Sequence, residues 1–334
     1  MDLYTLRNAQ GMAVRVCNFG ARIQQILVPD RHGQWADVVL GYGSLAELRR
    51  DTAWLGAFIG RYANRIAAAR LTLNGRHYTL PANDGQNILH GGARGCGMQV
   101  FDVRQVSTNR LELAYLFHAE DDGFPGELAL QLSYALDDQN TLWVAWTAQA
   151  LDQPTVASFT SHAYFNLSGL AHSTVLDHQV SIPADQVLDI AADGIPTGRV
   201  LAVQDTPFDL RRPQAIGQPQ GRGALDHYWI TDRRAQHEGL ALQARVLHPG
   251  SGRTLEVWST EPGLQFYAGG MLGHSDASPP LLDKRGLSFV RHGGLCLEPS
   301  GYPDAPNHPQ FPDTGLRPGL PRVGKIAYRF GVQA

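Results

Sequence analysis

Alternation between apolar and polar residues is the dominant pattern of this chain, and it predicts β-strands. Residues 110–119 alternate regularly, so one face of the resulting strand carries large apolar side chains. These side chains are Leu111, Leu113, Tyr115 and Phe117. Residues 128–138 continue the pattern through Leu128, Leu130 and Leu132. Residues 141–150 are apolar on both faces, so we expect a strand that is covered on both sides, as in the middle of a sandwich.

Turn-forming residues separate these segments. Residues 240–260 predict two strands joined by Pro249-Gly250-Ser251-Gly252, which is typical of a β-hairpin. Residues 324–332 predict one more strand, and the best candidate helix, Leu45–Thr52, is short. The content of 36 Gly and 20 Pro fits many turns between short strands. The sequence therefore predicts an all-β fold, a large antiparallel β-sandwich forming a single domain over residues 1–334.

Composition and charge exclude several classes of function. Lys and Arg number 28 and Asp and Glu 31, which gives a formal net charge of −3 and no basic cluster, so nucleic acid is not an expected partner. The three cysteines, Cys17, Cys96 and Cys296, lack metal-ligand spacing and suit a reducing, cytoplasmic location. The first residues show no secretory signal, and no run approaches about eighteen apolar residues, so we expect no membrane association.

Two polar side chains interrupt apolar strand patterns. His162 lies in TSHAYFNLSG, where apolar residues precede it and turn formers follow it. Glu298 follows the apolar run Gly-Leu-Cys-Leu and precedes Pro299, so we expect it at the last extended position of a strand. A lone histidine in a strand is more often a satisfied core residue than a functional one. A carboxylate after a buried strand is harder to explain without a partner or a purpose.

Four further segments carry polar groups beside glycine or aromatic residues. They are GRYANRIA at 60–67, NILHGG at 87–92, LDHYWI at 225–230 and PGLQFYAGG at 262–270. Taken singly, each suits a turn or a surface position. Together they supply guanidinium, amide, imidazole and carboxylate groups among aromatic rings, which suits a neutral, polyhydroxylated ligand. No glycine-rich phosphate loop and no nucleophile elbow are present in the sequence.

Six segments, taken in order, resemble the aldose 1-epimerase family, whose members are also called galactose mutarotases. They are GRYANRI, LHGG, SHAYFNLSG, LDH, PGLQFY and LEPSGYPDAPNHPQFP, and the resemblance continues to Arg317–Gly319. It implies the galactose mutarotase-like supersandwich, with His162 as general acid and Glu298 as general base. It also implies the substrate-holding groups, which are Asn64, Arg65, His90, Asp226 and Gln265.

The implied reaction interconverts the α and β anomers of free aldohexoses such as galactose and glucose. An acid protonates the ring oxygen while a base removes the proton of the C1 hydroxyl, and closure reverses both transfers. Proton transfer alone accounts for this, so we expect no cofactor and no metal, a monosaccharide substrate, and a monomer or homodimer. The segments Glu298-Pro299-Ser300 and Gly269-Gly270 depart from the family's usual residues, which leaves the preferred sugar open.

Three alternatives remain at this level. His90, His162 and Glu298 could form a cupin-like metal site, although cupin ligands cluster on adjacent strands and these residues are spread along the chain. The fold could serve a non-catalytic sugar-binding domain, against which the presence of both His162 and Glu298 argues. A relative acting on another sugar or on sugar phosphates is the third alternative, but only Arg65 is available for a phosphate.

Overall fold

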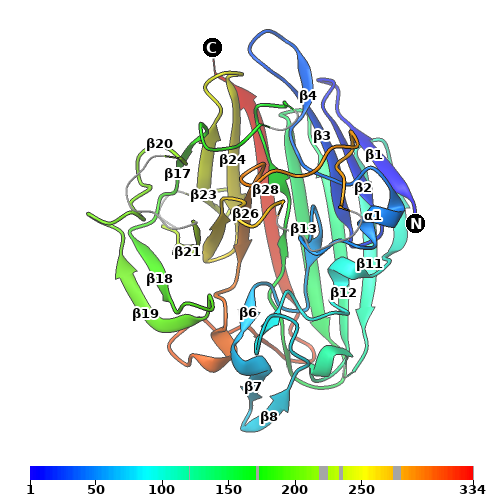
Figure 1. Cartoon of the computed structure of the whole chain (residues 1–334). Helices are drawn as coiled ribbons and strands as arrows, with labels where there is room; N and C mark the ends of the chain where they lie inside the picture. The colour runs from blue at the N-terminus through cyan, green and yellow to red at the C-terminus, as the bar shows by residue number, and fades with distance from the viewer. Residues whose placement is uncertain (120, 171–172, 218–224, 233–235, 274–279, 334) are drawn as a thin grey trace.

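Over the described part of the chain, antiparallel strands form three large sheets and four small ones (Figure 1). The computed structural model describes residues 1–119, 121–170, 173–217, 225–232, 236–273 and 280–333. The predicted all-β fold, a large antiparallel sandwich, is confirmed. No helix in the described parts of the chain is long and apolar enough to cross a bilayer.

The largest sheet has ten strands, with β22 (Gln236–His237) paired to β23 beside the main path. In spatial order the others are β10 (Asp102–Val106), β11 (Arg110–Phe117), β12 (Leu128–Leu136), β13 (Thr141–Ala150), β28 (Arg322–Val332), β24 (Arg253–Ser259), β23 (Leu240–Leu247), β17 (Gln179–Ser181) and β20 (Gln214–Ala215). Figure 1 shows the long strands of this sheet side by side.

The six-stranded sheet carries most of the candidate site. In spatial order its strands are β16 (Tyr164–Phe165), β26 (Leu295–Ser300), β25 (Gly263–Tyr267), β21 (Asp226–Ile230), β18 (Gln186–Ile190) and β19 (Pro196–Ala202). The four-stranded sheet consists of β1 (Leu3–Arg7), β2 (Ala13–Cys17), β3 (Arg22–Pro29) and β4 (Trp35–Asp37).

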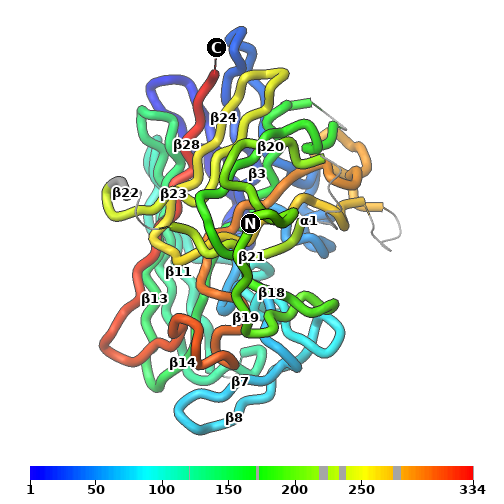
Figure 2. Tube along the Cα trace, turned by 90° about the vertical axis from the view of Figure 1, so that its left-hand side faces the viewer, coloured from blue at the N-terminus to red at the C-terminus, as the bar shows by residue number. Residues whose placement is uncertain are grey.

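Short two-stranded ladders and single helical turns connect the sheets. The pairs are β14 (Thr155–Val156) with β27 (Gly315–Leu316), β15 (Thr160–Ser161) with β5 (Phe58–Ile59), β6 (Arg65–Ile66) with β9 (Ile88–Leu89), and β7 (Arg70–Leu73) with β8 (Arg76–Thr79). The helical segments are α1 (Leu45–Leu48) and the 3₁₀ turns Ala67–Ala69, Cys96–Met98, Asp121–Gly123 and Ala305–Asn307. Both views place the hairpin of β7 and β8 at the end of the molecule opposite the C-terminus (Figure 2).

One hydrophobic cluster fills the space between the large sheets. It takes buried side chains from β2 and β3, from β12, β13 and β28, and from β25 and β26. Two tyrosines cross this space, because the Tyr134 hydroxyl donates to the Ala21 carbonyl at 2.6 Å and the Tyr328 hydroxyl donates to the Leu297 carbonyl at 3.4 Å. The expectation of one domain over residues 1–334 stays a prediction, which this shared cluster supports.

Most strand predictions are confirmed, including the hairpin of β23 and β24 and the C-terminal strand β28. The expected helix Leu45–Thr52 is wrong in its extent, because α1 ends at Leu48. Only Leu48 of that helix is buried, so no apolar stripe stabilises further turns. The strand over 141–150 is fully buried on one face only, since Trp143 and Ala145 on the other face are half-buried.

The predicted end of the strand at Glu298 is also wrong, because β26 continues through Pro299 to Ser300. Pro299 pairs in register with Leu264 of β25. On its other side β26 pairs with β16 only at Leu295 and Cys296. Pro299 therefore lies where β26 has a single neighbouring strand, and a residue without an N–H is tolerated at such a position.

Candidate active site

Three adjacent strands of the six-stranded sheet present polar side chains on one face. Glu298 of β26 pairs directly with Gln265 of β25, which in turn pairs with Tyr228 of β21. Asp226 lies two residues before Tyr228 and therefore on the same face. The Gln265 amide donates to the Asp226 carboxylate at 2.6 Å. The strand period thus gathers Asp226, Gln265 and Glu298, while the neighbouring Leu264, Phe266 and Leu297 point into the core.

His162 reaches this face from the gap between β15 and β16. Its backbone N–H donates to the Ala57 carbonyl at 2.8 Å, and its carbonyl accepts from the Gly56 N–H at 3.0 Å. These two bonds fix the residue against the segment before β5. The ring is buried, and its Nε2 lies 3.8 Å from Oε1 of Glu298. That separation exceeds hydrogen-bond length and leaves both atoms available to a third group.

His90 and Asn64 are joined by two hydrogen bonds, one to the His90 ring and one between their backbones. The Asn64 N–H donates to Nδ1 of His90 at 3.2 Å, and the His90 N–H donates to the Asn64 carbonyl at 3.0 Å. Both residues have a left-handed backbone, with φ of 64° at Asn64 and 54° at His90. Because Nδ1 accepts, the neutral His90 ring carries its proton on Nε2. The rings of His90 and His162 meet edge to face, with centroids 5.1 Å apart.

Arg65 lies at the rim, half-buried, at the start of β6. Its Nε donates to the Asp84 carboxylate at 2.7 Å, and its backbone carbonyl accepts from the Asp304 N–H at 2.9 Å. Arg65 and Asp226 both line an open hollow of about 810 Å³ beside the buried groups. Of the seven residues expected from the sequence, Arg65 and Asp226 line this hollow, and the contacts described above connect the other five to them in one region.

Burial sets the protonation of the central groups. Desolvation raises the pKa of Glu298 well above its usual value, the negative charge of Asp226 raises it further, and the positive charge of Arg65 lowers it. Desolvation lowers the pKa of His162 to about 4, against a smaller opposing effect of its own backbone carbonyl and of Asp51. Desolvation also lowers the pKa of His90 well below its usual value. Both imidazoles are therefore neutral near pH 7, and Glu298 is a stronger base than an exposed glutamate.

Three side chains at this site were not expected from the sequence. Trp54 has a φ of 52° and places its ring 4.7 Å from the His90 ring and 6.4 Å from the His162 ring, between centroids. Tyr164 lies beside His162, with ring centroids 5.1 Å apart, and Cys296 lies below the same imidazole. Tyr164 and Cys296 stand inside the segments that carry the family resemblance, whereas Trp54 follows a short helix and has no local signal of a site.

A metal-binding site is the main chemical alternative to a proton-transfer site. The structure corrects the idea that His90, His162 and Glu298 are too dispersed, since one ligating atom from each lies within 4.8 Å of the others. A cation needs a lone pair on the nitrogen that faces it. The Asn64 N–H occupies the lone pair on Nδ1 of His90 and leaves a proton on Nε2. This donor set fits a hydroxylated ligand better than a metal.

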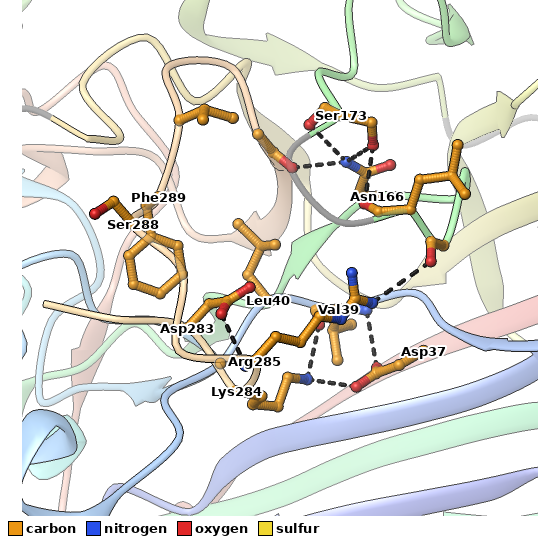
Figure 3. A pocket seen from close by; sticks show the side chains of 15 residues that line it. Asp37, Val39, Leu40, Asn166, Ser173, Asp283, Lys284, Arg285, Ser288 and Phe289 are labelled. Carbon is orange, nitrogen blue, oxygen red and sulfur yellow. Dashed lines mark hydrogen bonds and ion pairs between the residues drawn. The ribbon is translucent and has the colours of Figure 1, made fainter.

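A second hollow, shown in Figure 3, has a different character. Its lysine, Lys284, donates from Nζ to the Asp37 carboxylate at 2.5 Å and to the carbonyls of Gln24 and Val39. The Asn166 amide donates to the Gly293 carbonyl at 2.8 Å. The hollow measures about 50 Å³, which is too small for a sugar. The hydrogen bonds around this hollow connect the segment before β26 to β4 and to the end of β16. They therefore support the strand that carries Glu298.

The fold and the site together define a class of protein. An antiparallel sandwich holds a neutral imidazole and a buried carboxylate across a gap, with amide, carboxylate and guanidinium groups around it. The chemistry of these groups is suited to transferring protons to and from a hydroxylated ligand.

The family model "Aldose 1-epimerase" matches residues 2–329, so the chain belongs to the aldose 1-epimerase family. The chain is 40% identical to a galactose mutarotase from Sus scrofa over 322 residues, which cover 96% of this chain and 91% of that protein. It is 34% identical to an aldose 1-epimerase from Escherichia coli (strain K12) over 339 residues, covering 98% of this chain and 94% of that one. A solved aldose epimerase homologue from C. elegans superposes with a TM-score of 0.91 at 29% identity, covering 100% and 99% of the two chains.

Proposed function

We propose that this enzyme interconverts the α and β anomers of free aldoses, with His162 as general acid and Glu298 as general base. The observation that carries the assignment is the placement of Nε2 of His162 3.8 Å from Oε1 of Glu298, in a buried site. Its relatives of 34–40% identity, the galactose mutarotase and the aldose 1-epimerase, support the reaction type.

Each step of the reaction moves one proton in each direction. The Glu298 carboxylate takes the proton of the C1 hydroxyl, while the His162 N–H gives a proton to the ring oxygen and the C1–O5 bond breaks, so the negative charge passes from Glu298 to the imidazole until closure. The free aldehyde then turns about the C1–C2 bond. Closure returns the proton from O5 to His162 and the proton from Glu298 to the carbonyl oxygen, on the other face of C1. Each positioned group contributes a factor of about 10² to 10⁴ to the rate.

The surrounding groups hold the hydroxyls that do not react. The Gln265 amide and the Asp226 carboxylate form one hydrogen-bonded unit beside Glu298, so they present donors and acceptors in a fixed arrangement. The Nε2–H of His90 points a donor towards the same space, and Arg65 with Asn64 borders it. The half-buried Trp54 ring offers an apolar wall for the C–H face of a sugar. Arg65 is already paired with Asp84, which argues against a sugar phosphate as substrate.

The compartment and the preferred sugar belong to the same proposal. The three cysteines are free and buried, which suits a reducing cytoplasm. Galactose is the first sugar to test, because it appears in the name of the relative from Sus scrofa.

Polarimetry on freshly dissolved α-anomers tests the proposal directly. Solutions of galactose, glucose, xylose and arabinose should approach their equilibrium rotation faster with the enzyme than with heat-denatured protein in the same buffer. The spontaneous rate is subtracted, because buffer acids and bases also accelerate it. No acceleration with any of the four sugars would overturn the proposal in favour of a sugar-binding domain, which titration calorimetry would then detect.

A further inference from the structure

One strand reaches both ring nitrogens of the acid. Cys296 and Glu298 are two residues apart on β26 and so point to the same face. The Glu298 carboxylate lies 3.8 Å from Nε2 of His162, and the Cys296 sulfur lies 3.5 Å from Nδ1 of the same ring. The second of these contacts lies within hydrogen-bond range for sulfur, and the catalytic assignment above does not use it.

The thiol acts as a donor towards the ring. Cys296 has no exposed surface, and desolvation raises the pKa of its thiol well above the usual value, so the sulfur keeps its proton. Tyr164 pairs with Cys296 across β16 and β26, so its side chain lies beside the thiol. Desolvation raises the pKa of Tyr164 as well, so its hydroxyl is protonated. The protonated thiol can therefore donate its S–H to Nδ1 of His162.

The position of the single imidazole proton decides whether His162 can act. At pH values above its pKa of about 4 the ring has one N–H. A proton on Nε2 faces the substrate side, where Glu298 lies, whereas a proton on Nδ1 would face away from it. A donor at Nδ1 favours the productive tautomer, because Nδ1 must then offer its lone pair and the proton stays on Nε2.

We propose that Cys296, which pairs with Tyr164 across β16 and β26, is a positioning residue that donates its S–H to Nδ1 of His162 and so keeps the imidazole proton on Nε2. The inference rests on the proposed role of His162 as the acid. It assigns a catalytic purpose to a cysteine that otherwise belongs to a small apolar cluster with Leu55 and Leu272. In serine hydrolases, where a carboxylate fixes the histidine tautomer, its loss lowers kcat strongly. A neutral thiol is a weaker device, so the expected effect is smaller.

Cysteine variants with a matched control test the effect on rate. Cys296→Ala should lower kcat by about tenfold with KM nearly unchanged, because the tautomer affects proton transfer and not sugar binding. Cys296→Ser, which keeps a donor, should recover part of the loss. Cys96→Ala is the control, since Cys96 is equally buried and its thiol bonds to the Phe58 carbonyl, at 3.4 Å, and not to an imidazole of the described residues. Equal kcat losses in Cys96→Ala and Cys296→Ala would reduce the effect to packing and overturn the inference.

The tautomer itself can be observed by NMR with ¹⁵N-labelled histidine. The signals of His162 are those missing from His162→Asn. In the wild-type protein we expect the proton on Nε2, and in Cys296→Ala a measurable population with the proton on Nδ1. A wild-type proton on Nδ1 would make the sulfur an acceptor and would refute the inference. This readout does not depend on activity, so it separates failure of the tautomer proposal from failure of the acid assignment, which His162→Asn tests.

Discussion

Two clusters of imidazole and carboxylate groups in this molecule have similar compositions and differ in the hydrogen bonds that their atoms form. The first is His90, His162 and Glu298, and the second is Asp177, His178 and His248. In each, one ligating atom per residue lies within 4.8 Å of the others. From residue types and distances alone, either could be catalytic or metal-binding. Their hydrogen bonds separate them.

In the second cluster every ring nitrogen has a partner. The Leu167 N–H donates to Nε2 of His178 at 2.9 Å, and the Ser251 N–H donates to Nδ1 of His248 at 3.1 Å. The remaining nitrogens therefore carry protons, and both donate to Asp177, at 2.9 Å from His178 and 3.2 Å from His248. The cluster joins the end of β16, the start of β17 and the turn between β23 and β24. The two imidazoles and the carboxylate of this cluster are therefore engaged in hydrogen bonds that stabilise the fold.

In the first cluster, the polar groups that face one another can still form hydrogen bonds to a ligand. Over the described residues, the structure shows no hydrogen bond to the Glu298 carboxylate, whose nearest imidazole nitrogen is 3.8 Å away. Backbone and thiol contacts hold the far side of the two rings and leave Nε2 facing the gap. A site is thus recognised by polar atoms that the protein itself does not satisfy.

The largest expected effect is on kcat, when the acid or the base of the first cluster is replaced. His162→Asn and Glu298→Gln should each lower kcat by at least about a hundredfold, because each removes one positioned proton-transfer group. His178→Asn should keep kcat within about twofold and instead lower the free energy of unfolding by about 1–3 kcal/mol, since buried hydrogen bonds to Leu167 and Asp177 are lost.

Polarimetry gives the rates, and urea unfolding followed by circular dichroism gives the stabilities. The rates are taken at a temperature where every variant is folded. A His178 variant with a hundredfold lower kcat and unchanged stability would erase the distinction between the clusters. Near wild-type kcat in the folded Glu298→Gln variant would remove Glu298 from its role.

The fold could be predicted from the sequence where packing alone dictates the pattern. Leu111, Leu113 and Phe117 of β11 are buried because a half-covered strand needs apolar residues at every second position. The pattern fails where a local rule meets tertiary context. Pro299 was expected to follow the strand, but it sits inside β26 because the neighbouring β16 is too short to need its N–H.

The site could be predicted only in part, for a related reason. His162 and Glu298 were identifiable because each interrupts an apolar strand, and the remaining five residues came from the family resemblance. The proposed role of Cys296 was not predictable, since a cysteine in an apolar run is expected to be a core residue. Its contact with His162 joins residues 134 positions apart. The second cluster escaped for the same reason, because His178 and His248 belong to unrelated local patterns.

The next largest effect concerns the groups around the first cluster. Asp226→Ala and Arg65→Ala should raise KM by about tenfold and should lower kcat less than the acid and base variants do. Their hydrogen bonds to non-reacting hydroxyls exist in both the ground state and the transition state, so much of the loss is uniform binding. Saturation kinetics by polarimetry measure this. An unchanged KM would remove the substituted residue from the pocket.

The pH dependence should sharpen the contrast further, with a smaller effect. Glu298 must be ionised to act, so kcat/KM should fall as pH falls through its raised pKa. Asp226→Asn removes a negative charge and should move this acid limb to lower pH, whereas Arg65→Gln removes a positive charge and should move it to higher pH. The neutral His162, with a pKa of about 4, should produce no alkaline limb near neutrality.

Rates across a pH series, corrected for the spontaneous reaction, test these directions in each variant. Limbs are assigned by the variant that moves them, because interacting groups titrate together. An acid limb that stays in place in both charge variants, or that persists in the residual activity of Glu298→Gln, would identify a different base.

The smallest predicted effect is that of metal ions, which we expect to leave the activity unchanged because neither cluster is suited to bind them. A metal bound by Nδ1 of His178 would require that nitrogen to lose its proton while Nε2 still accepts from Leu167, which leaves an anionic ring. In the first cluster the Asn64 N–H imposes the same obstacle at His90. Activity should therefore be unchanged after prolonged dialysis against a chelator, and added Zn²⁺ or Mn²⁺ should not raise it. Elemental analysis of the dialysed protein is the control that the chelator has done its work. Activity that is lost on chelation and restored by one divalent ion would mean that the imidazole rings flip and offer lone pairs to the metal. The hydrogen bonds from Asn64 and Leu167 would then no longer distinguish a catalytic cluster from a structural one.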